Sequence, residues 1–124
     1  MMEYASEKST QGKIQMAEPK LTVAHSGLIK VRTVALDDYV EAERLCPDMI
    51  KIDVEGAAGF VFAGAGKVLS QIRPIVFVEL HGPDEQLAVD QAMRDYGYQA
   101  FDTDGNYIES LVQGWHSPII CRPK

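Results

Sequence analysis

Residues 49–58, Met-Ile-Lys-Ile-Asp-Val-Glu-Gly-Ala-Ala, decide the fold of this 124-residue chain. Side chains alternate between the two faces of a strand, so the apolar residues at positions 50, 52 and 54 point one way. The charged residues at positions 51, 53 and 55 point the other way. The apolar face is therefore expected to pack against a core. The charged face is expected to meet water, a ligand or a partner.

A second apolar run, residues 74–81, becomes polar only at its end. Between the two runs, from Ala57 to Gln71, apolar side chains recur at helical spacing. A strand, a helix and a strand in this order form a right-handed crossover that leaves the strands parallel. Polar residues at the two strand ends are then expected in one cleft, where open α/β sheets bind ligands. These residues are Asp53, Glu55, Glu79 and His81.

The four strand-end residues suit acid–base chemistry, because carboxylate and imidazole groups can accept a proton from a hydroxyl group. Lys51 is expected to pair with Asp53 or Glu55, since an unpaired buried ammonium is costly. A solvated strand end is the alternative for the acids. The same four residues are also candidates for a divalent cation, but their sequence spacing does not show that the donor atoms are close, and no metal is predicted.

Further elements are predicted along the chain. Asp37 can cap a short helix that ends near Leu45. Residues 82–85, Gly-Pro-Asp-Glu, are expected to begin a helix, and Gly97 fits the left-handed residue just past its end. Strands are predicted at Tyr98–Phe101 and at residues 118–122, with a tight turn at residues 103–106.

The beginning of the chain is polar and lacks periodicity. Residues 1–20 are expected to form a disordered leader, and residues 21–124 a single α/β domain. Within this domain, residues 21–24 and 28–34 flank a turn signal and are predicted to form a small hairpin.

The amino-acid composition argues against several classes of function. Eighteen acidic residues against 12 basic ones give a net charge of −6, which argues against binding to nucleic acids or anionic membranes. No segment approaches the roughly 20 apolar residues of a membrane span. Cys46 and Cys121 match neither a metal motif nor a disulfide framework, so a cytoplasmic location is expected.

The ordered motifs of the chain resemble the C-terminal half of the FkbM family of S-adenosylmethionine-dependent methyltransferases. The resemblance covers roughly residues 31–124 and implies a partial Rossmann-like methyltransferase sheet with an antiparallel last strand. It also implies the strand order Ile50, Ile75, Ile119, Tyr98. The matching residues are Leu36-Asp37, Ile50 to Gly56, Gly64-Ala65, Arg73-Pro74, Val78-Glu79 and Gly97-Tyr98.

The chain departs from the family pattern in two places. Ala58 stands where the family usually has a glutamate. Nothing before Val31 resembles the first strand and glycine-rich loop that hold the methyl donor, and Gly64-Ala65-Gly66 lies inside a predicted helix. The resemblance therefore implies a truncated enzyme that, alone, is inactive and binds S-adenosylmethionine weakly or not at all.

The resemblance implies O-methyl transfer to a small-molecule or sugar hydroxyl. It makes Asp53, Glu55, Glu79 and His81 the candidate catalytic residues, with Asp53 also near the methyl donor. Two alternatives remain: a non-enzymatic remnant or self-associating interaction module, and an unrelated α/β binding domain. The expected partners are a small-molecule acceptor and either a second copy of the chain or a complementary N-terminal half.

Overall fold

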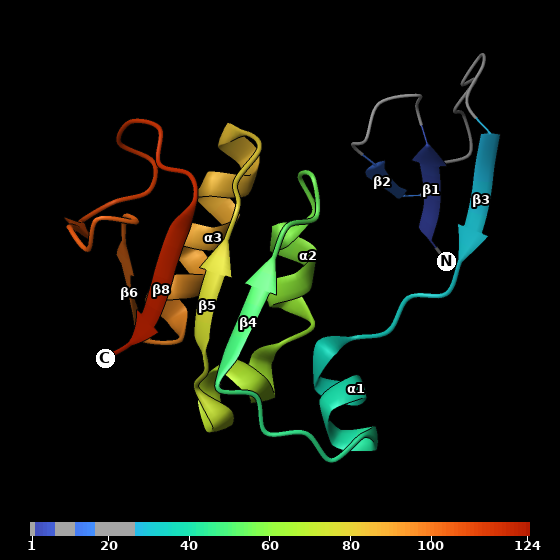
Figure 1. Ribbon diagram of the computed structural model, residues 1–124, viewed down its shortest axis with the longest axis horizontal. Helices are drawn as coiled ribbons and strands as arrows, with labels where there is room; N and C mark the ends of the chain where they lie inside the picture. Colours follow the sequence, from blue (N-terminus) through green and yellow to red (C-terminus); the bar gives the residue numbers. More distant parts are fainter. Residues whose placement is uncertain (1, 7–11, 17–26) are drawn as a thin grey trace.

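A computed structural model describes residues 2–6, 12–16 and 27–124, and its main body is a five-stranded mixed sheet. The strand order is β4-β5-β8-β6-β7; β4 and β5 are parallel, and the other pairs are antiparallel (Figure 1). The predicted α/β class, parallel pair and strand order are confirmed. The strands are β4 (Met49–Ile52), β5 (Ile75–Val78), β6 (Tyr98–Phe101), β7 (Tyr107–Ile108) and β8 (Ile119–Pro123).

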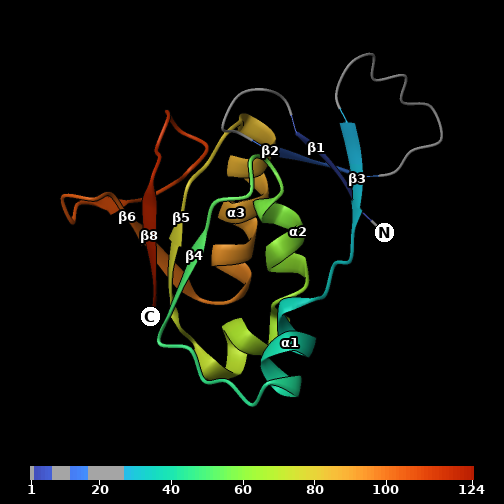
Figure 2. The same ribbon diagram turned by 45° about the vertical axis from the view of Figure 1, so that its right-hand side comes forward.

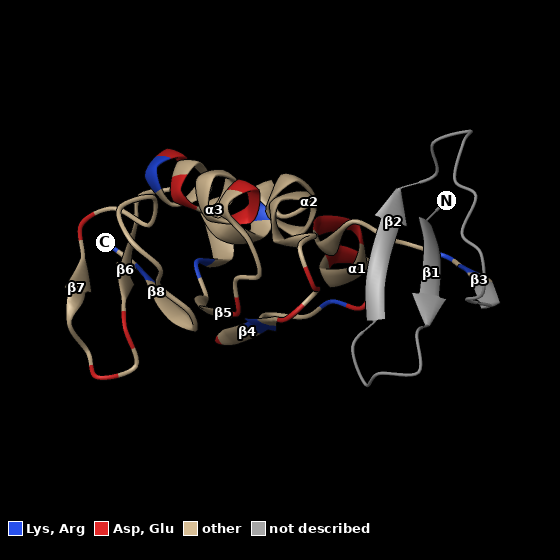
Figure 3. Ribbon diagram, turned by 90° about the horizontal axis from the view of Figure 1, so that it is seen from above, with Lys and Arg blue, Asp and Glu red and all other residues tan. Residues whose placement is uncertain are grey.

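The helices α2 (Ala58–Ala63) and α3 (Pro83–Asp95) cover one face of this sheet, and no helix of the described residues covers the other (Figure 3). Turning the molecule shows the same helix layer beside β4 and β5 (Figure 2). The two helices pack closely, because a Cβ on Gly59 would lie 2.9 Å from the Cβ of Ala88. No described helix is long and apolar enough to cross a membrane.

The core lies between the helix layer and the covered face of the sheet. Alternate residues of the strands enter it, so Ile52, Val78 and Cys121 are almost fully buried, while Lys51 is exposed. The alternation read from the sequence of β4 therefore sets which side of the strand meets the helices.

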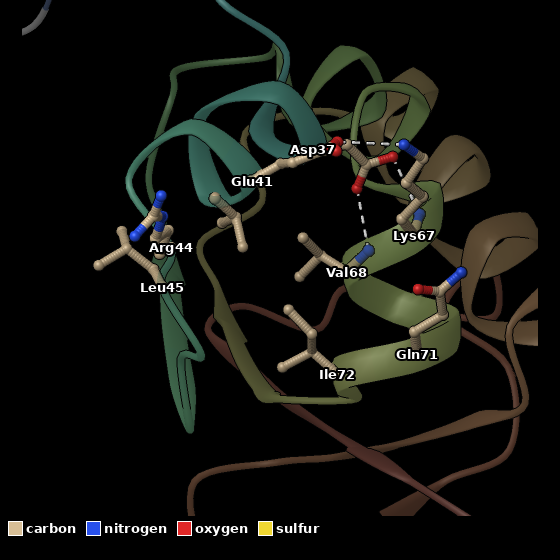
Figure 4. Close-up of a pocket in the computed structure, with 9 residues that line it drawn as sticks. Asp37, Glu41, Arg44, Leu45, Lys67, Val68, Gln71 and Ile72 are labelled. Carbon is tan, nitrogen blue, oxygen red and sulfur yellow. Dashed lines mark hydrogen bonds and ion pairs between the residues drawn. The ribbon is translucent and has the colours of Figure 1, made fainter.

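The predicted helix from Ala57 to Gln71 is interrupted. The helix α2 ends at Ala63, and a separate π-helical segment, η1, runs over Val68–Ile72. The Asp37 carboxylate accepts hydrogen bonds from the backbone N–H groups of Lys67 and Val68, each at 2.9 Å (Figure 4). The side chain of Asp37, which is distant in the sequence, thus accepts hydrogen bonds from N–H groups at the start of η1 that have no partner within the helix.

Asp37 does not cap the short helix in which it lies. The helix α1 spans Leu36–Ala42, and its N-cap residue, Ala35, makes no side-chain cap. The prediction of a helix here is confirmed, but the capping prediction is wrong, because the carboxylate reaches residues 67 and 68 instead.

Arg73 and Pro74 join the end of α3 to the start of β5. The Arg73 guanidinium donates to the carbonyl oxygens of Tyr96, at 3.0 Å, and Gly97, at 3.2 Å. The Tyr98 hydroxyl donates to the carbonyl of Pro74 at 2.8 Å. The Arg-Pro and Gly-Tyr pairs of the sequence thus contact one another and fix this junction.

The start of the chain contains strands where a leader without regular structure was predicted. The strands β1 (Met2–Ser6), β2 (Gly12–Met16) and β3 (Gly27–Val31) form an antiparallel sheet in the order β2-β1-β3. The strands β1 and β2 fall within residues 1–20, whose sequence lacks apolar periodicity. The first arm of the predicted hairpin, residues 21–24, lies outside the described residues, and β3 pairs with β1.

Candidate functional site

The candidate site lies where β4 and β5 end, on the sheet face away from the helices. Lys51 pairs in register with Phe77, and the N–H of Glu79 donates to the carbonyl of Ile52 at 2.9 Å. The parallel pairing therefore carries the residues after both strands to the same edge of the sheet. Asp53, Glu55, Glu79 and His81 come together there, as the sequence predicts.

The His81 ring lies between two carboxylates. Its Nε2 atom is 3.1 Å from Oδ1 of Asp53, and its Nδ1 atom is 3.5 Å from Oε2 of Glu55. The side chain of His81 is 26% exposed, so the ring is held by its neighbours and still reaches solvent. Both ring nitrogens thus face acidic oxygens.

Lys51 neutralises part of this negative charge. Its Nζ atom lies 3.5 Å from Oε1 of Glu79 and 4.0 Å from Oδ2 of Asp53. The predicted pairing with Asp53 is confirmed, while the second partner is Glu79 rather than Glu55. The Lys51 side chain is 60% exposed, so the ion pairs are screened and contribute little to stability.

The turn after β4 has an unusual backbone. Both Glu55, with φ of +49°, and Gly56, with φ of +101°, lie in the left-handed region. Glycine adopts this conformation freely, whereas a glutamate does so at a cost of about 1 kcal/mol or more. Such strain is common at functional sites, and here it directs the Glu55 carboxylate to His81.

Glu85 holds the backbone next to the site through hydrogen bonds, and it was not predicted as a site residue. It is 4% exposed, and its carboxylate accepts hydrogen bonds from the N–H groups of Ala58, at 2.9 Å, and His81, at 2.6 Å. The carboxylate thereby joins the starts of α2 and α3 to the loop after β5. The sequence placed Glu85 in the first turn of a helix, but gave no sign of its long-range contact with Ala58; His81 is only four residues away.

A surface hollow of about 460 Å³ adjoins the cluster. It is lined by Glu55, His81 and the first residues of α3, including Glu85. A larger hollow, of about 530 Å³, lies between α1 and η1 and contains none of the four predicted site residues (Figure 4). Of these two hollows, only the first is lined by residues of the strand-end cluster, namely Glu55 and His81.

Comparison with known proteins identifies one family. The family model described as the methyltransferase FkbM domain matches residues 4–100. This match begins well before residue 31, where the motif resemblance begins, and it ends before β7 and β8. No curated protein and no solved structure matches the chain.

Proposed function

Because this chain belongs to the FkbM methyltransferase family, we propose that it functions in S-adenosylmethionine-dependent methyl transfer to a hydroxyl group of a small molecule or sugar. The observation that carries the proposal is the His81 ring held between Asp53 and Glu55 beside an open hollow. The family match does not favour the alternative of a non-enzymatic remnant.

The residues of the cluster fit the acceptor. A hydroxyl group must lose its proton as its oxygen takes the methyl group and the bond between that methyl group and the donor sulfur breaks, and a positioned imidazole or carboxylate can take that proton. In this proposal, Asp53 and His81 share the proton and Glu55 orients the imidazole, while Lys51 and Glu79 border the acceptor. The neighbouring hollow gives the acceptor its entry.

When it is bound, the methyl donor supplies the electrophilic methyl group. The residues of this chain fit only the positively charged part of the donor. The donor carries positive charge on its sulfonium and ammonium groups, which suits the carboxylate of Asp53. Within residues 2–6, 12–16 and 27–124, no glycine-rich loop joins a strand to the start of a helix, and Gly64 and Gly66 lie between α2 and η1. We therefore expect binding of S-adenosylmethionine by the chain alone to be weaker than low micromolar, as calorimetry can test.

Self-association is a second part of the proposal. Among residues 2–6, 12–16 and 27–124, no strand pairs with the outer edge of β4. Proteins usually pair or protect such edges, and Met49 at this edge is 64% exposed. We expect the chain to pair through β4 with a second copy or with a complementary N-terminal half; a monodisperse monomer across a dilution series in light scattering would contradict the pairing of copies.

The catalytic proposal is best tested on the native assembly, purified from its own cells through a tag on this chain. Transfer of labelled methyl groups from S-adenosylmethionine to a panel of hydroxyl compounds is measured for the wild type and for Asp53→Asn. We expect Asp53→Asn to lower the rate at least about a hundredfold, with a thermal midpoint near that of the wild type.

Asp38→Asn is the matched control, since Asp38 is an exposed aspartate on α1. It should leave the rate unchanged. A native assembly without any methyl transfer would contradict the proposed function, and parallel losses of rate and stability in Asp53→Asn would show that Asp53 is structural.

A further inference from the structure

We propose that Asp53, Glu79 and His81 bind one divalent cation of the Mn²⁺ or Zn²⁺ type. Each residue offers one ligand atom, and these three atoms lie within 4.8 Å of one another. The sequence spacing alone gave no support for such a site, because the three donors meet only through the pairing of β4 with β5. The role of the cation rests on the proposed function: it would hold the acceptor hydroxyl and ease loss of its proton to solvent, while Asp53 and His81, when they bind the ion, act as ligands in place of the proton acceptors of the metal-free proposal.

The donor set fits such an ion in chemistry and size. Imidazole and carboxylate ligands suit Mn²⁺ and Zn²⁺, with metal–ligand distances of roughly 2.0–2.2 Å. Neighbouring ligands of a tetrahedral or octahedral ion at these distances are roughly 3–3.6 Å apart, so atoms that lie within 4.8 Å of one another must move closer by about 1 Å. Asp53 and Glu79 are 36% and 35% exposed, which permits that movement.

Glu55 supplies the outer contact that a metal-binding histidine usually has. Metal-bound histidines donate their second ring N–H to a carboxylate or carbonyl, which fixes the ring and its tautomer. Here the Nδ1 atom of His81 faces Glu55 at 3.5 Å, while Nε2 faces Asp53 at 3.1 Å. A neutral ring has a single N–H, so when Nδ1 carries it, the lone pair of Nε2 faces an oxygen lone pair of Asp53. A cation bound by both atoms would remove that repulsion; in the other tautomer Nε2–H donates to Asp53, and the ion must displace that hydrogen bond.

Lys51 shows that a positive charge is already accommodated between the two acidic ligands. Its ammonium lies 3.5 Å from Glu79 and 4.0 Å from Asp53. The cluster contains three carboxylates, those of Asp53, Glu55 and Glu79, and Lys51 pairs with two of them, so an excess of negative charge remains. A divalent cation would compete with the ammonium for the same two oxygens.

The other well-placed carboxylates of the molecule differ from this set. Glu85 and Asp37 each accept two backbone N–H bonds and have structural roles. By contrast, Asp53 and Glu79 contact charged or titratable side chains at an open edge of the sheet. Their oxygens are therefore available to an ion.

The test is Mn²⁺ binding by the full chain, measured by calorimetry and by the electron paramagnetic resonance of free Mn²⁺, without donor or acceptor. We expect His81→Gln and Glu79→Gln each to weaken binding at least about tenfold. Lys51→Met should strengthen binding at least about threefold, because it removes the competing ammonium. Circular dichroism and thermal midpoints check that each variant folds.

Two matched controls come from the ion pair of Glu41 and Lys67, whose atoms lie 3.2 Å apart on the surface. Glu41→Gln and Lys67→Met change the net charge as the test variants do, and should leave Mn²⁺ binding unchanged. Binding that survives both His81→Gln and Glu79→Gln, or no binding at millimolar Mn²⁺, would overturn the proposed site.

The metal site and the proposed function can fail separately. Mn²⁺ binding that depends on these residues in an assembly without methyl transfer supports the site and contradicts the function. Methyl transfer that persists after chelation, in a chain that binds no Mn²⁺, supports the function and overturns the site.

Discussion

The two faces of the five-stranded sheet are built from neighbouring residues of the same strands, yet they differ in kind. On the covered face, Ile52 and Val78 pack beneath α2 and α3 and are 5% and 0% exposed. On the other face, Lys51 is open to solvent and the strands continue into Asp53 and Glu79. The comparison teaches that stability comes mainly from one face, while the groups able to bind and react gather at the end of the other.

The sharpest test of this comparison uses adjacent residues of β4. Ile52→Ala should lower the free energy of unfolding by about 3 kcal/mol, because it removes buried methyl groups and leaves a cavity. Lys51→Ala should change it by no more than about 0.5 kcal/mol, since the ion pairs of Lys51 are exposed. Urea denaturation measures the free energy of unfolding of both variants. Similar losses would show that the open face contributes as much to stability as the covered face.

Glu85 should show the next largest effect. Glu85→Ala leaves the N–H groups of Ala58 and His81 without their carboxylate partner, so we expect a loss of about 2 kcal/mol in the free energy of unfolding. Asp84→Ala is the control, because Asp84 is the exposed neighbour on the same helical turn. Thermal and urea denaturation compare the variants; equal, small effects would mean that Glu85 does not join the two helices.

Asp37 tests whether a carboxylate outside the sheet is structural. Asp37→Ala should lower the free energy of unfolding by about 1 kcal/mol, since two N–H groups at the start of η1 lose their cap. Asp38→Ala, one residue further along the same helix, should have almost no effect. If amide hydrogen exchange of Lys67 and Val68 is unchanged in Asp37→Ala, the cap does not hold this segment.

The buried thiol of Cys121, on the covered face of the sheet, should make the stability of the folded chain depend on pH. Burial raises the pKa of its thiol from 9.0 to about 12. The unfolded chain therefore loses this proton near pH 9 while the folded chain keeps it, so stability falls as the pH rises from 9 toward 12. Between pH 8 and pH 10 we expect Cys121 to contribute a loss of about 1 kcal/mol. Cys121→Ala should remove this contribution in urea titrations at the two pH values, and an unchanged difference would contradict the burial of the thiol.

Local patterns predicted a large part of the fold. Alternation marked β4, the strand at Tyr98–Phe101 was predicted with its observed bounds, and Gly82-Pro83 marked the start of α3. The order of the strands followed from the resemblance to the FkbM family and is confirmed. The gathering of Asp53, Glu55, Glu79 and His81 was also predicted, because parallel strands bring their ends to one edge. Their catalytic role stays a prediction.

What the sequence determined by itself is therefore what local chemistry controls: which residues alternate, where glycine and proline end an element, and which side chains stand at a strand end. Only the tertiary structure decided that Asp37 caps η1, that Glu85 joins two helices, and that Lys51 pairs with Glu79. It also decided the pairing of β1 with β2 and β3. Apart from the pairing of β1 with β2, which are neighbours in the sequence, these contacts join residues far apart in the chain. A carboxylate's partner depends on which donors the fold brings within about 3 Å of it, which neighbouring residues do not specify.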